Sequence, residues 1–274
     1  MTEQELIKAA LAEDLAGGAD ITSEATISAD ANSSADFVAR MDGVIAGSNI
    51  AHAVLAEVGL TDVTQLKKDG DSVKAGDILI SVRGNTRAIL LAERTALNFF
   101  CHLSGIATLT NKWVKEVSGT KCQVRDTRKT TPGMRVIEKY AVRMGGGVNH
   151  RMSLSDAALI KDNHIAAAGG VVAAFAKVRS AYPSAEIEIE VDTLAQLKEV
   201  LPLAPDLILL DNMNPEVCAQ AVALVNGKCK LEASGGISIS SARAYAQSGV
   251  DYIAIGALTH SAPVFDIGLD LRTE

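Results

Sequence analysis

The sequence contains few cysteines and no long apolar run, and each absence excludes a class of protein. The four cysteines among 274 residues show no C-x-x-C spacing, so we expect reduced, buried side chains and neither a disulfide framework nor a zinc site. No apolar stretch approaches the roughly 20 residues that a membrane-spanning helix requires. The stretch "MTEQELIKAALAEDL" predicts an acidic amphipathic helix rather than an export signal, so we expect a cytoplasmic protein without a membrane partner.

A general excess of positive charge is also absent. The net charge is -7 and the isoelectric point is near 5.3, which argues against nucleic acid or an anionic membrane as the main partner. Any cationic site must therefore be local. The hydrophobic content of 48% is enough to bury a large core, in one large domain or in two smaller ones.

The first part of the chain shows a mixed α+β pattern. Helix signals at 3–15 and in "NIAHAVLAEVG" alternate with strand signals in "DFVARM", "VIAG", "VTQLKK" and "DILISVRG". A long helical run, "RAILLAERTALNFFCHL", is then interrupted by Ser104-Gly105. We therefore expect a domain boundary at this dipeptide, between an N-terminal domain of residues 1–104 and a second domain of residues 105–261.

From residue 121 the pattern becomes a repetition of strand, loop and helix. Apolar strand candidates lie at 122–126, 157–161, 186–191, 207–211, 229–233 and 252–255. Helical stretches separate most of them, which is typical of parallel strands joined by helical crossovers. A doubly wound nucleotide-binding sheet would carry G-x-G-x-x-G after its first strand. The stretch "MGGGVNHR" has neither that spacing nor that position, so an α/β barrel is favoured.

Charged side chains follow the ends of these predicted strands. In an α/β barrel, catalytic groups lie at the carboxyl ends of the strands and in the following loops. The residues at these ends are Arg125, Asp126, Arg128, Lys129, Lys161, Asp162, Glu190, Asp211, Glu232, Ser234 and Gly256. A buried strand that ends in an unpaired charge carries a large desolvation penalty. A functional site explains the pattern better than surface charge, with a structural ion pair as the alternative for each residue.

Positive charge is concentrated between residues 125 and 161. This segment has eight Lys or Arg and only three Asp or Glu side chains in a chain that is acidic as a whole, so we expect it to bind an anion. Arginine offers a planar fork for carboxylate or phosphate and lysine a compact charge for phosphate, so the mixture indicates a ligand with both groups. Arg135, Lys139 and Arg143, spaced by four, are interpreted as a solvated helix face.

Glu190 and Asp211 end consecutive predicted strands and face this cationic edge. They could form ion pairs with it, or hold Mg²⁺ together with substrate phosphates. The metal is favoured, because Mg²⁺ typically takes one or two protein carboxylates and completes its shell from phosphate and water. Glu186 and Glu188 share the strand face of Glu190 by alternation, so we expect both to point into the barrel as structural partners.

Two stretches with little side-chain bulk follow the last two strands. Such loops can direct backbone N–H groups at a phosphate, assisted by a helix N-terminus. In α/β barrels the phosphate site is usually formed at this position. The sequence therefore predicts a phosphate site made of Ser234, Gly235 and Gly236 together with Ile255, Gly256 and Ala257.

Nine short segments occur in one order along nearly the whole chain: "EDLAGGADIT", "AERTALNFFCHLSGIAT", "DTRKTTPGMR", "GGGVNHR", "LIKDNHI", "EIEVDTL", "LLDNM", "EASGGI" and "IAIGALTHSAP". In this combination the sequence resembles the quinolinate phosphoribosyltransferase family, also called nicotinate-nucleotide pyrophosphorylase (carboxylating). The resemblance implies an N-terminal α/β sandwich, a TIM-like α/β barrel with an incomplete set of strands, a segment 262–274 that packs back on the first domain, and a homodimer. It also implies that quinolinate and phosphoribosyl pyrophosphate give nicotinate mononucleotide, pyrophosphate and CO₂, with Mg²⁺, in NAD biosynthesis.

The resemblance implies roles for individual residues at the two reacting groups. Arg128, His150 and Arg151 would hold the pyridine dicarboxylate. Lys129 and Lys161 would contact the phosphoribosyl donor and lie near the carboxylate that is lost. These two lysines would belong to the catalytic residues.

Further roles implied by the resemblance concern the donor and the dimer. Glu190 and Asp211 would serve the ribose and the Mg²⁺-pyrophosphate, as catalytic residues and metal ligands. Arg94 would reach into the barrel of the neighbouring subunit. The remaining substrate-binding residues would be Thr127, Ser234, Gly235, Gly236, Ile255, Gly256 and Ala257.

Two positions depart from the family pattern, and three alternative functions stay open. Met144 stands where cysteine is usual and Ser153 where glycine is usual, and both affect loop geometry rather than charge.

A relative associated with molybdenum-transport loci shares part of the pattern but lacks the counterpart of Lys161. A phosphoribosyltransferase for nicotinate would need fewer cations for its single carboxylate. A non-catalytic phosphate-sugar-binding barrel would not need Lys161, Glu190 and Asp211 together.

Overall fold

The computed structural model describes residues 2–272. The chain forms two compact units, and neither is one continuous stretch. The N-terminal unit contains Met1–Asn111, Thr130–Gly146 and Leu258–Glu274, and the barrel unit contains Lys112–Lys129 and Gly147–Ala257. Among the described residues, no helix combines the length and the apolar character needed to cross a membrane.

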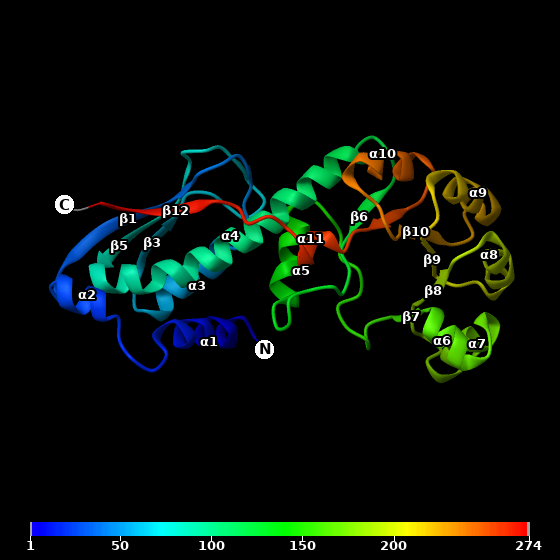
Figure 1. The fold of residues 1–274 in the computed structure, drawn as a ribbon, viewed down its shortest axis with the longest axis horizontal. Helices are drawn as coiled ribbons and strands as arrows, with labels where there is room; N and C mark the ends of the chain where they lie inside the picture. The colour runs from blue at the N-terminus through cyan, green and yellow to red at the C-terminus, as the bar shows by residue number, and fades with distance from the viewer. Residues whose placement is uncertain (1, 273–274) are drawn as a thin grey trace. The chain divides into compact units, whose positions relative to one another are not determined.

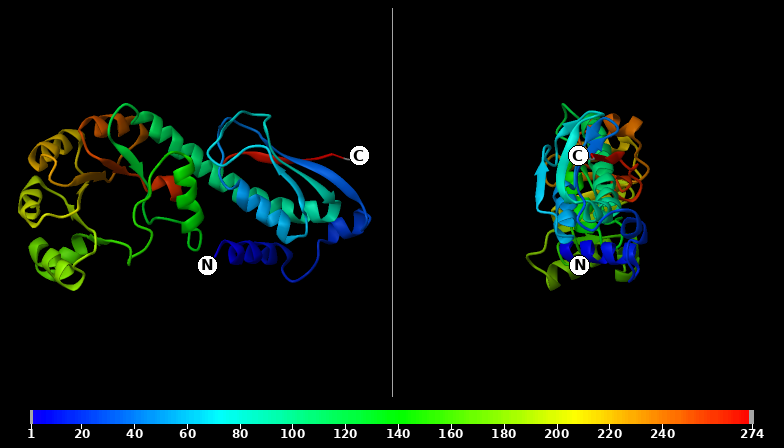
Figure 2. Two further views of the ribbon diagram at one scale, coloured as in Figure 1. Left: turned by 180° about the vertical axis from the view of Figure 1, so that it is seen from behind. Right: turned by 90° about the vertical axis from the view of Figure 1, so that its left-hand side faces the viewer.

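The N-terminal unit is built on an antiparallel sheet with the strand order β12-β1-β5-β3. These strands are β1 (Asn32–Ala39), β3 (Asp62–Gln65), β5 (Ile78–Asn85) and β12 (Ile267–Arg272), and a small second sheet pairs β2 (Gly43–Val44) with β4 (Ser72–Val73). The first helices are α1 (Glu3–Leu15), α2 (Ile21–Thr26) and α3 (Ser48–Glu57). Phe37 of β1 and its partner Ile80 of β5 are fully buried in the core of this unit. Figure 2 shows β12 lying along β1.

Helix α4 (Thr86–Glu116) is continuous, so the predicted interruption at Ser104-Gly105 is wrong. Both residues instead pack inside the N-terminal unit. The hydroxyl of Ser104 accepts the N–H of Ala46 at 3.1 Å and donates to its carbonyl at 3.2 Å. A Cβ added to Gly105 would lie 2.2 Å from the carbonyl oxygen of Pro263. Glycine is therefore present because another backbone approaches closely, and it does not end the helix.

Helix α5 (Arg135–Met144) also differs from its prediction. The interpretation of Arg135, Lys139 and Arg143 as a solvated face is wrong for Lys139, which is fully buried, whereas Arg135 is half-buried and Arg143 is exposed as expected. The neighbouring Glu138 is fully buried too, and its carboxylate accepts the N–H of Thr131 at 3.0 Å and lies 2.9 Å from Nε2 of His102. Spacing by four places cations on one side of a helix, but it does not reveal which side the tertiary structure covers.

The barrel unit is a parallel sheet with the strand order β6-β11-β10-β9-β8-β7, and the predicted α/β class is confirmed. The strands are β6 (Gln123–Arg125), β7 (Ala158–Ile160), β8 (Ile187–Val191), β9 (Leu207–Asp211), β10 (Lys230–Ser234) and β11 (Tyr252–Ala254). The connecting helices are α6 (Asp162–Ala168), α7 (Val171–Ala181), α8 (Leu194–Val200), the 3-10 helix η1 (Leu201–Leu203), α9 (Pro215–Val225) and α10 (Ile239–Gln247), and α11 (Ala257–His260) follows β11. In Figure 1 helices α7 to α10 lie on the outer side of the curved sheet.

The sheet of the barrel unit begins with β6 and ends with β7, and these two strands do not pair with each other among the described residues. Val148 forms an isolated parallel bridge with Arg125, so part of the segment 147–157 lies along the free edge of β6. The barrel thus has an incomplete set of strands, and the chain at its opening is a loop rather than a strand.

Strand β8 places two of its three predicted glutamates inside the unit. Glu188 and Glu190 are 4% and 8% exposed. Glu186 precedes the strand and is exposed, so the expectation that it points into the barrel is wrong. Because β8 begins at Ile187, Glu186 lies at the amino end of the sheet, away from the predicted site.

Candidate active site

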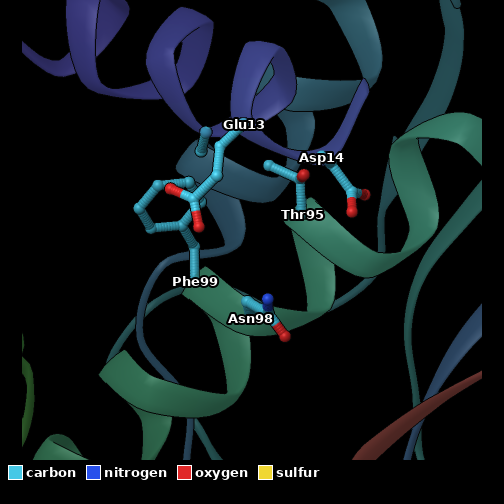
Figure 3. A pocket seen from close by; sticks show the side chains of 6 residues that line it. Glu13, Asp14, Thr95, Asn98 and Phe99 are labelled. Carbon is cyan, nitrogen blue, oxygen red and sulfur yellow. The ribbon is translucent and has the colours of Figure 1, made fainter. Parts of the chain in front are cut away.

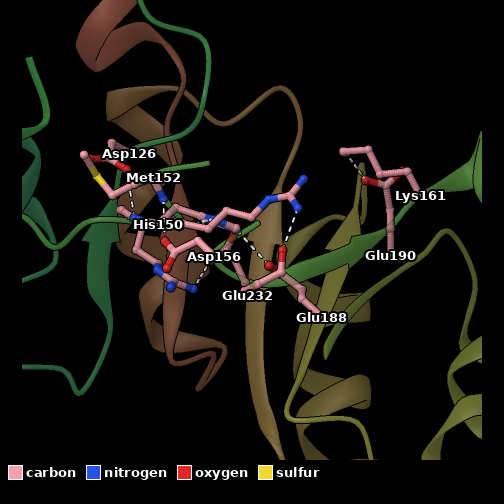
Figure 4. A network of polar contacts seen from close by, with 11 residues as sticks. Asp126, His150, Met152, Asp156, Lys161, Glu188, Glu190 and Glu232 are labelled. Atoms are coloured by element: carbon pink, nitrogen blue, oxygen red, sulfur yellow. Dashed lines mark hydrogen bonds and ion pairs between the residues drawn. The ribbon is translucent and has the colours of Figure 1, made fainter. Parts of the chain in front are cut away.

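The carboxyl ends of the six parallel strands meet at one edge of the sheet, as they do in α/β barrels generally. Every predicted site residue except Arg94 belongs to the barrel unit. The strand register places Ser234 beside Asp211. Figure 4 shows Lys161 pointing toward Glu190 at this edge. The structure therefore brings together the residues that the strand ends predict.

Arg128 and Arg151 form the centre of the cationic part of the site. Burial and the positive charge of Arg128 both lower the pKa of the Arg151 guanidinium. The Nη1 of Arg151 donates to the carbonyl of Ala157 at 2.7 Å, which holds the side chain in place. Two like charges kept close together in a partly buried place favour the binding of an anion between or beside them.

The loop that carries Arg128 also carries Thr127 and Lys129. The hydroxyl of Thr127 accepts the backbone N–H of Lys129 at 3.1 Å, which tightens the turn between the two residues. Lys129 is exposed, whereas Arg128 is partly buried. The loop thus presents its guanidinium close to the barrel and its ammonium to solvent.

Three buried polar side chains, His150, Glu188 and Glu232, lie close together inside the barrel unit (Figure 4), and the half-buried Arg125 contacts them. The Nη1 of Arg125 donates to Glu232 at 2.7 Å. The Nε2 of His150 lies 2.8 Å from Glu188 and 3.6 Å from the second oxygen of Glu232. Burial raises the pKa of both glutamates to about 7. Burial therefore favours the neutral form of both carboxylates, and Arg125 supplies the positive charge that offsets this effect at Glu232.

The hydrogen bonds of His150 assign its tautomer. Its Nδ1 accepts the backbone N–H of Arg151 at 2.7 Å, so this nitrogen carries the lone pair. The hydrogen is then on Nε2, which points to Glu188 at 2.8 Å. Both ring nitrogens of His150 thus have partners within the barrel unit, and a bound carboxylate would share Nε2 with Glu188.

Lys161, Glu190 and Asp211 form a second charged group. The ammonium of Lys161 lies 2.5 Å from Oε2 of Glu190. Burial raises the pKa of Asp211, and the negative charge of Glu190 adds to the effect. Two neighbouring carboxylates with one lysine between them keep a net negative charge, which favours the binding of a further cation.

Two sets of residues in the barrel unit offer metal-ligand atoms. Those of His150, Glu188 and Glu232 lie within 4.8 Å of one another, but Arg125 already neutralises Glu232 by a direct hydrogen bond. Glu190 and Asp211 fit Mg²⁺ better, because they offer only oxygen ligands at neighbouring strand ends, where burial and then the charge of Glu190 raise the pKa of Asp211.

The predicted phosphate loop has backbone angles that only glycine adopts without strain. Gly235 and Gly236 have φ of +91° and +63°. A Cβ on Gly235 would also lie 2.2 Å from Oδ1 of Asn212, the residue after Asp211. The N–H of Asn212 donates to the carbonyl of Ser234 at 2.9 Å and ties the two loops together. The second stretch, 255–257, is buried at Ile255 and partly exposed at Gly256 and Ala257.

Arg94 lies on α4 in the N-terminal unit, where its side chain is exposed. Among residues 2–272, it forms no ion pair, so the alternative of a pair with Glu93 or another local acid is not seen. Thr95, the residue after Arg94, lines a cavity of about 280 Å³ between α1 and α4 (Figure 3). It also contains Glu13 and Asp14 and none of the predicted anion-binding residues, so it does not suit the anionic ligand.

Sequence reasoning placed Asp126 at a strand end without giving it a role. The structure shows it to be fully buried, and its carboxylate accepts the backbone N–H of His150 at 2.8 Å. The available signal was its position: an acid between Arg125 and Arg128 at the end of an apolar strand has to find a buried partner.

The site suits a transferase that acts on a ligand with both carboxylates and phosphates. Guanidiniums, a lysine beside two carboxylates and a glycine loop lie at the strand ends of one parallel barrel. Comparison with known protein families narrows this class. Residues 20–104 match "Quinolinate phosphoribosyl transferase, N-terminal domain", and residues 106–270 match the corresponding C-terminal domain. The chain therefore belongs to the quinolinate phosphoribosyl transferase family, and the family predicted from the motifs is confirmed.

Individual proteins show the same similarity. The chain is 50% identical over 274 residues to the nicotinate-nucleotide pyrophosphorylase [carboxylating] of Mycobacterium leprae, covering 98% of this chain and 96% of that one. It is 40% identical to a probable enzyme of the same name from Bacillus subtilis, covering 94% and 90%. The solved nicotinate-nucleotide pyrophosphorylase from Ehrlichia chaffeensis has a TM-score of 0.95 at 41% identity and covers 99% of both chains. The one from Francisella tularensis has a TM-score of 0.94 at 40% identity, covering 98% and 96%.

Proposed function

We propose that the protein transfers the phosphoribosyl group of phosphoribosyl pyrophosphate to the ring nitrogen of quinolinate and releases CO₂. The products are nicotinate mononucleotide and pyrophosphate, as required for NAD biosynthesis. The observation that carries this proposal is that two half-buried arginines, Arg128 and Arg151, follow two segments that are joined at Asp126, and that burial and the charge of Arg128 lower the pKa of Arg151. A ligand with two carboxylates relieves that repulsion by offering one to each guanidinium, and quinolinate has two.

The residues at the pyridine end orient the substrate. Arg128 and Arg151 bind the carboxylates, and His150 offers its Nε2–H to one of them in place of Glu188. With both carboxylates held, the ring nitrogen faces the donor and can attack without a nucleophilic side chain. Once this nitrogen is bonded to the ribose, the positively charged ring stabilises the electron pair that the departing CO₂ leaves on the ring carbon, and this carbon then takes up a proton from water.

The residues at the donor end stabilise the charge that develops as pyrophosphate leaves. Lys129 and Lys161 contact the donor, and their ammonium groups favour the transition state because negative charge grows on the leaving oxygens there. Glu190 and Asp211 would hold Mg²⁺ with the pyrophosphate, and their oxygen ligands suit that ion. When bound, Mg²⁺ supplies further positive charge to the leaving group.

The two loops at the last strands hold the 5′-phosphate of the donor. The positive φ angles of Gly235 and Gly236 support this role, because they let backbone N–H groups approach an anion without side-chain hindrance. Ser234 adds a hydroxyl, and Ile255, Gly256 and Ala257 complete the cradle. Thr127 shapes the adjoining loop by accepting the N–H of Lys129.

The working enzyme is proposed to be a homodimer in which Arg94 completes the site of the neighbouring subunit. The exposure of Arg94, and its lack of an acidic partner within residues 2–272, support this role. An exposed guanidinium that is not paired within its own chain is suited to bind a phosphate or a carboxylate supplied from outside. The cytoplasmic location rests on the sequence prediction alone.

The test is a turnover assay with purified protein, quinolinate, phosphoribosyl pyrophosphate and Mg²⁺. Nicotinate mononucleotide and CO₂ should appear in equal amounts. Nicotinate in place of quinolinate is the matched substrate control, and it should react poorly because one guanidinium is left without a carboxylate. Equal turnover of the two pyridines would contradict the proposal and favour a nicotinate phosphoribosyltransferase.

A further inference from the structure

Asp126 is a fully buried carboxylate at the end of β6 and has no place in the reaction described above. Its Oδ1 accepts the backbone N–H of His150 at 2.8 Å, and its Oδ2 accepts a hydrogen bond from the side-chain amide of Asn149 (Figure 4 shows the bond to His150). One side chain thus holds two consecutive residues, and the next residue along the chain is Arg151.

The backbone of this segment runs alongside β6 before it reaches Asp126. The N–H of Val148 donates to the carbonyl of Val124 at 2.9 Å, and the N–H of Asp126 donates to the carbonyl of Val148 at 3.3 Å. The following bond goes from the N–H of His150 to the carboxylate of Asp126. A side chain thus ends the strand-like pairing, and it sets the direction in which the segment leaves the sheet.

Two segments that carry arginines meet at this carboxylate. Arg128 follows Asp126 by two residues, and Arg151 comes directly after His150. Burial and then the charge of Arg128 lower the pKa of Arg151, and like charges brought together in this way repel each other. The segments that carry Arg128 and Arg151 therefore need a stabilising interaction that keeps the two guanidiniums close together. Asp126 is fully buried and accepts hydrogen bonds from both Asn149 and His150, so it ties this segment to the end of β6 at two consecutive residues.

We propose that Asp126 is a positioning residue for the site of the dicarboxylate substrate. Through its hydrogen bonds to Asn149 and His150, Asp126 fixes the distance between Arg128 and Arg151. This inference rests on the proposed function, and Asp126 itself does not contact the substrate. If Asp126 only stabilised the fold, its replacement would lower stability and affect both substrates alike.

The test compares Asp126→Asn with the double variant Asp126→Asn/Asn149→Asp. In the single variant, two donors from Asn149 and His150 face a side chain that has lost one acceptor oxygen. We expect the KM for quinolinate to rise by about tenfold or more and the KM for phosphoribosyl pyrophosphate by less than about threefold. The double variant exchanges donor and acceptor between the two positions, so it should regain most of the lost quinolinate affinity.

Asp251→Asn is the matched control. Asp251 also accepts a backbone N–H, that of Leu231 at 2.9 Å, but it precedes β11 at the amino ends of the strands. Its replacement disturbs this bond, and the ion pair of Asp251 with Lys121 at 2.9 Å, in the same sheet but at the other end of the strands. We expect it to lower the melting temperature and to leave the quinolinate KM unchanged.

The outcomes separate this inference from the proposed function. The inference is overturned if Asp126→Asn leaves the quinolinate KM unchanged, or raises both KM values equally while wild-type turnover is normal. If Asp126→Asn does not fold, Asn149→Ala removes only one of the two bonds and should still raise the quinolinate KM. An unchanged quinolinate KM in Asn149→Ala would also overturn the inference about Asp126. Failure of the wild-type protein to convert quinolinate would overturn both.

Discussion

Lys161 and Glu190 form an ion pair between the ends of the neighbouring strands β7 and β8, with Nζ 2.5 Å from Oε2. The side chain of Glu190 is 9% exposed and that of Lys161 is 45% exposed. Asp211 follows on the next strand, and the charge of Glu190 contributes to its raised pKa. Lys161 therefore balances two carboxylates and still presents part of its side chain to a ligand.

The first prediction concerns this lysine. Lys161→Ala leaves Glu190 without its cation and removes a charge that stabilises the leaving pyrophosphate, so kcat should fall by about 100-fold or more. Steady-state release of CO₂ measures the effect. Lys230→Ala is the control, because Lys230 lies in the same unit, is exposed, and bonds to the hydroxyl of Tyr252 at the amino end of its strand rather than at the predicted site. A kcat within a few fold of wild type for Lys161→Ala would argue against its catalytic role.

The second prediction concerns the guanidinium of Arg151. Arg151→Lys keeps the charge but loses the planar fork, so quinolinate binding should weaken by about 1.5–3 kcal/mol, the range for hydrogen bonds to charged groups. Titration calorimetry measures this change. Arg179→Lys is a suitable control, since Arg179 pairs with Asp206 before the amino end of β9. Unchanged quinolinate affinity in Arg151→Lys would remove Arg151 from the dicarboxylate site.

The third prediction concerns the metal. EDTA should abolish turnover and added Mg²⁺ should restore it. Without the metal ion, the negative charges of the pyrophosphate and of the two carboxylates would repel each other. Asp211→Asn should raise the Mg²⁺ concentration needed for half-maximal activity. It should not unfold the protein, because Asp211 is only partly buried at its strand end. Full activity in metal-free buffer would refute the metal role.

The fourth prediction concerns Arg94 and the dimer. Arg94→Ala and Lys161→Ala homodimers should each be nearly inactive. Refolding the two variants together should restore activity, because each mixed dimer then has one site with both native side chains and one site with neither. Activity per verified mixed dimer is the measurement. Mixed dimers as inactive as their parents would show that Arg94 does not act across the interface.

The fifth prediction concerns pH and stability. Burial raises the pKa of Glu232 from 4.5 to about 7, so the folded protein binds more protons than the unfolded chain between these values. The unfolding free energy therefore loses a contribution as pH rises through this window. Glu232→Gln removes the titration, so its stability relative to wild type should increase with pH, by at most about 3 kcal/mol. Urea denaturation across the window measures the slope.

An exposed carboxylate provides the control for this slope. Glu216 lies at the start of α9 and is exposed. Glu216→Gln is the matched variant, because it removes an exposed carboxylate of the same unit instead of a buried one. Parallel slopes for Glu232→Gln and wild type would mean that Glu232 is charged in both the folded and the unfolded state.

Much of the barrel unit could be predicted because its local signals agree with its tertiary structure. The strand at 207–211 was predicted with the bounds it has, since an apolar run between turn residues has one interpretation in an alternating α/β chain. Ser104-Gly105 and Lys139 were misjudged for the opposite reason. Their environments are set by Pro263 and by the fold around α5, which no local pattern encodes.

The sequence was enough to predict which residues belong to the candidate site, but not which of them contact each other. Polar residues at strand ends identify Lys161, Glu190 and Asp211, because parallel strands place their ends together. The pairing of His150 with Glu188 depends on how a loop at the barrel opening enters the interior, and sequence spacing does not contain that information. For the same reason the partners of Asp126 could not be predicted.

The pairing of β1 with β12 has a consequence for how the chain folds during synthesis. One edge of β1 is paired only when β12, a late part of the chain, lies antiparallel to it. Until then β1 is an edge strand with unpaired backbone groups, and such edges attract the strands of other chains. A nascent or C-terminally truncated chain should therefore depend on chaperones to stay unaggregated, while the full-length chain closes that edge by itself.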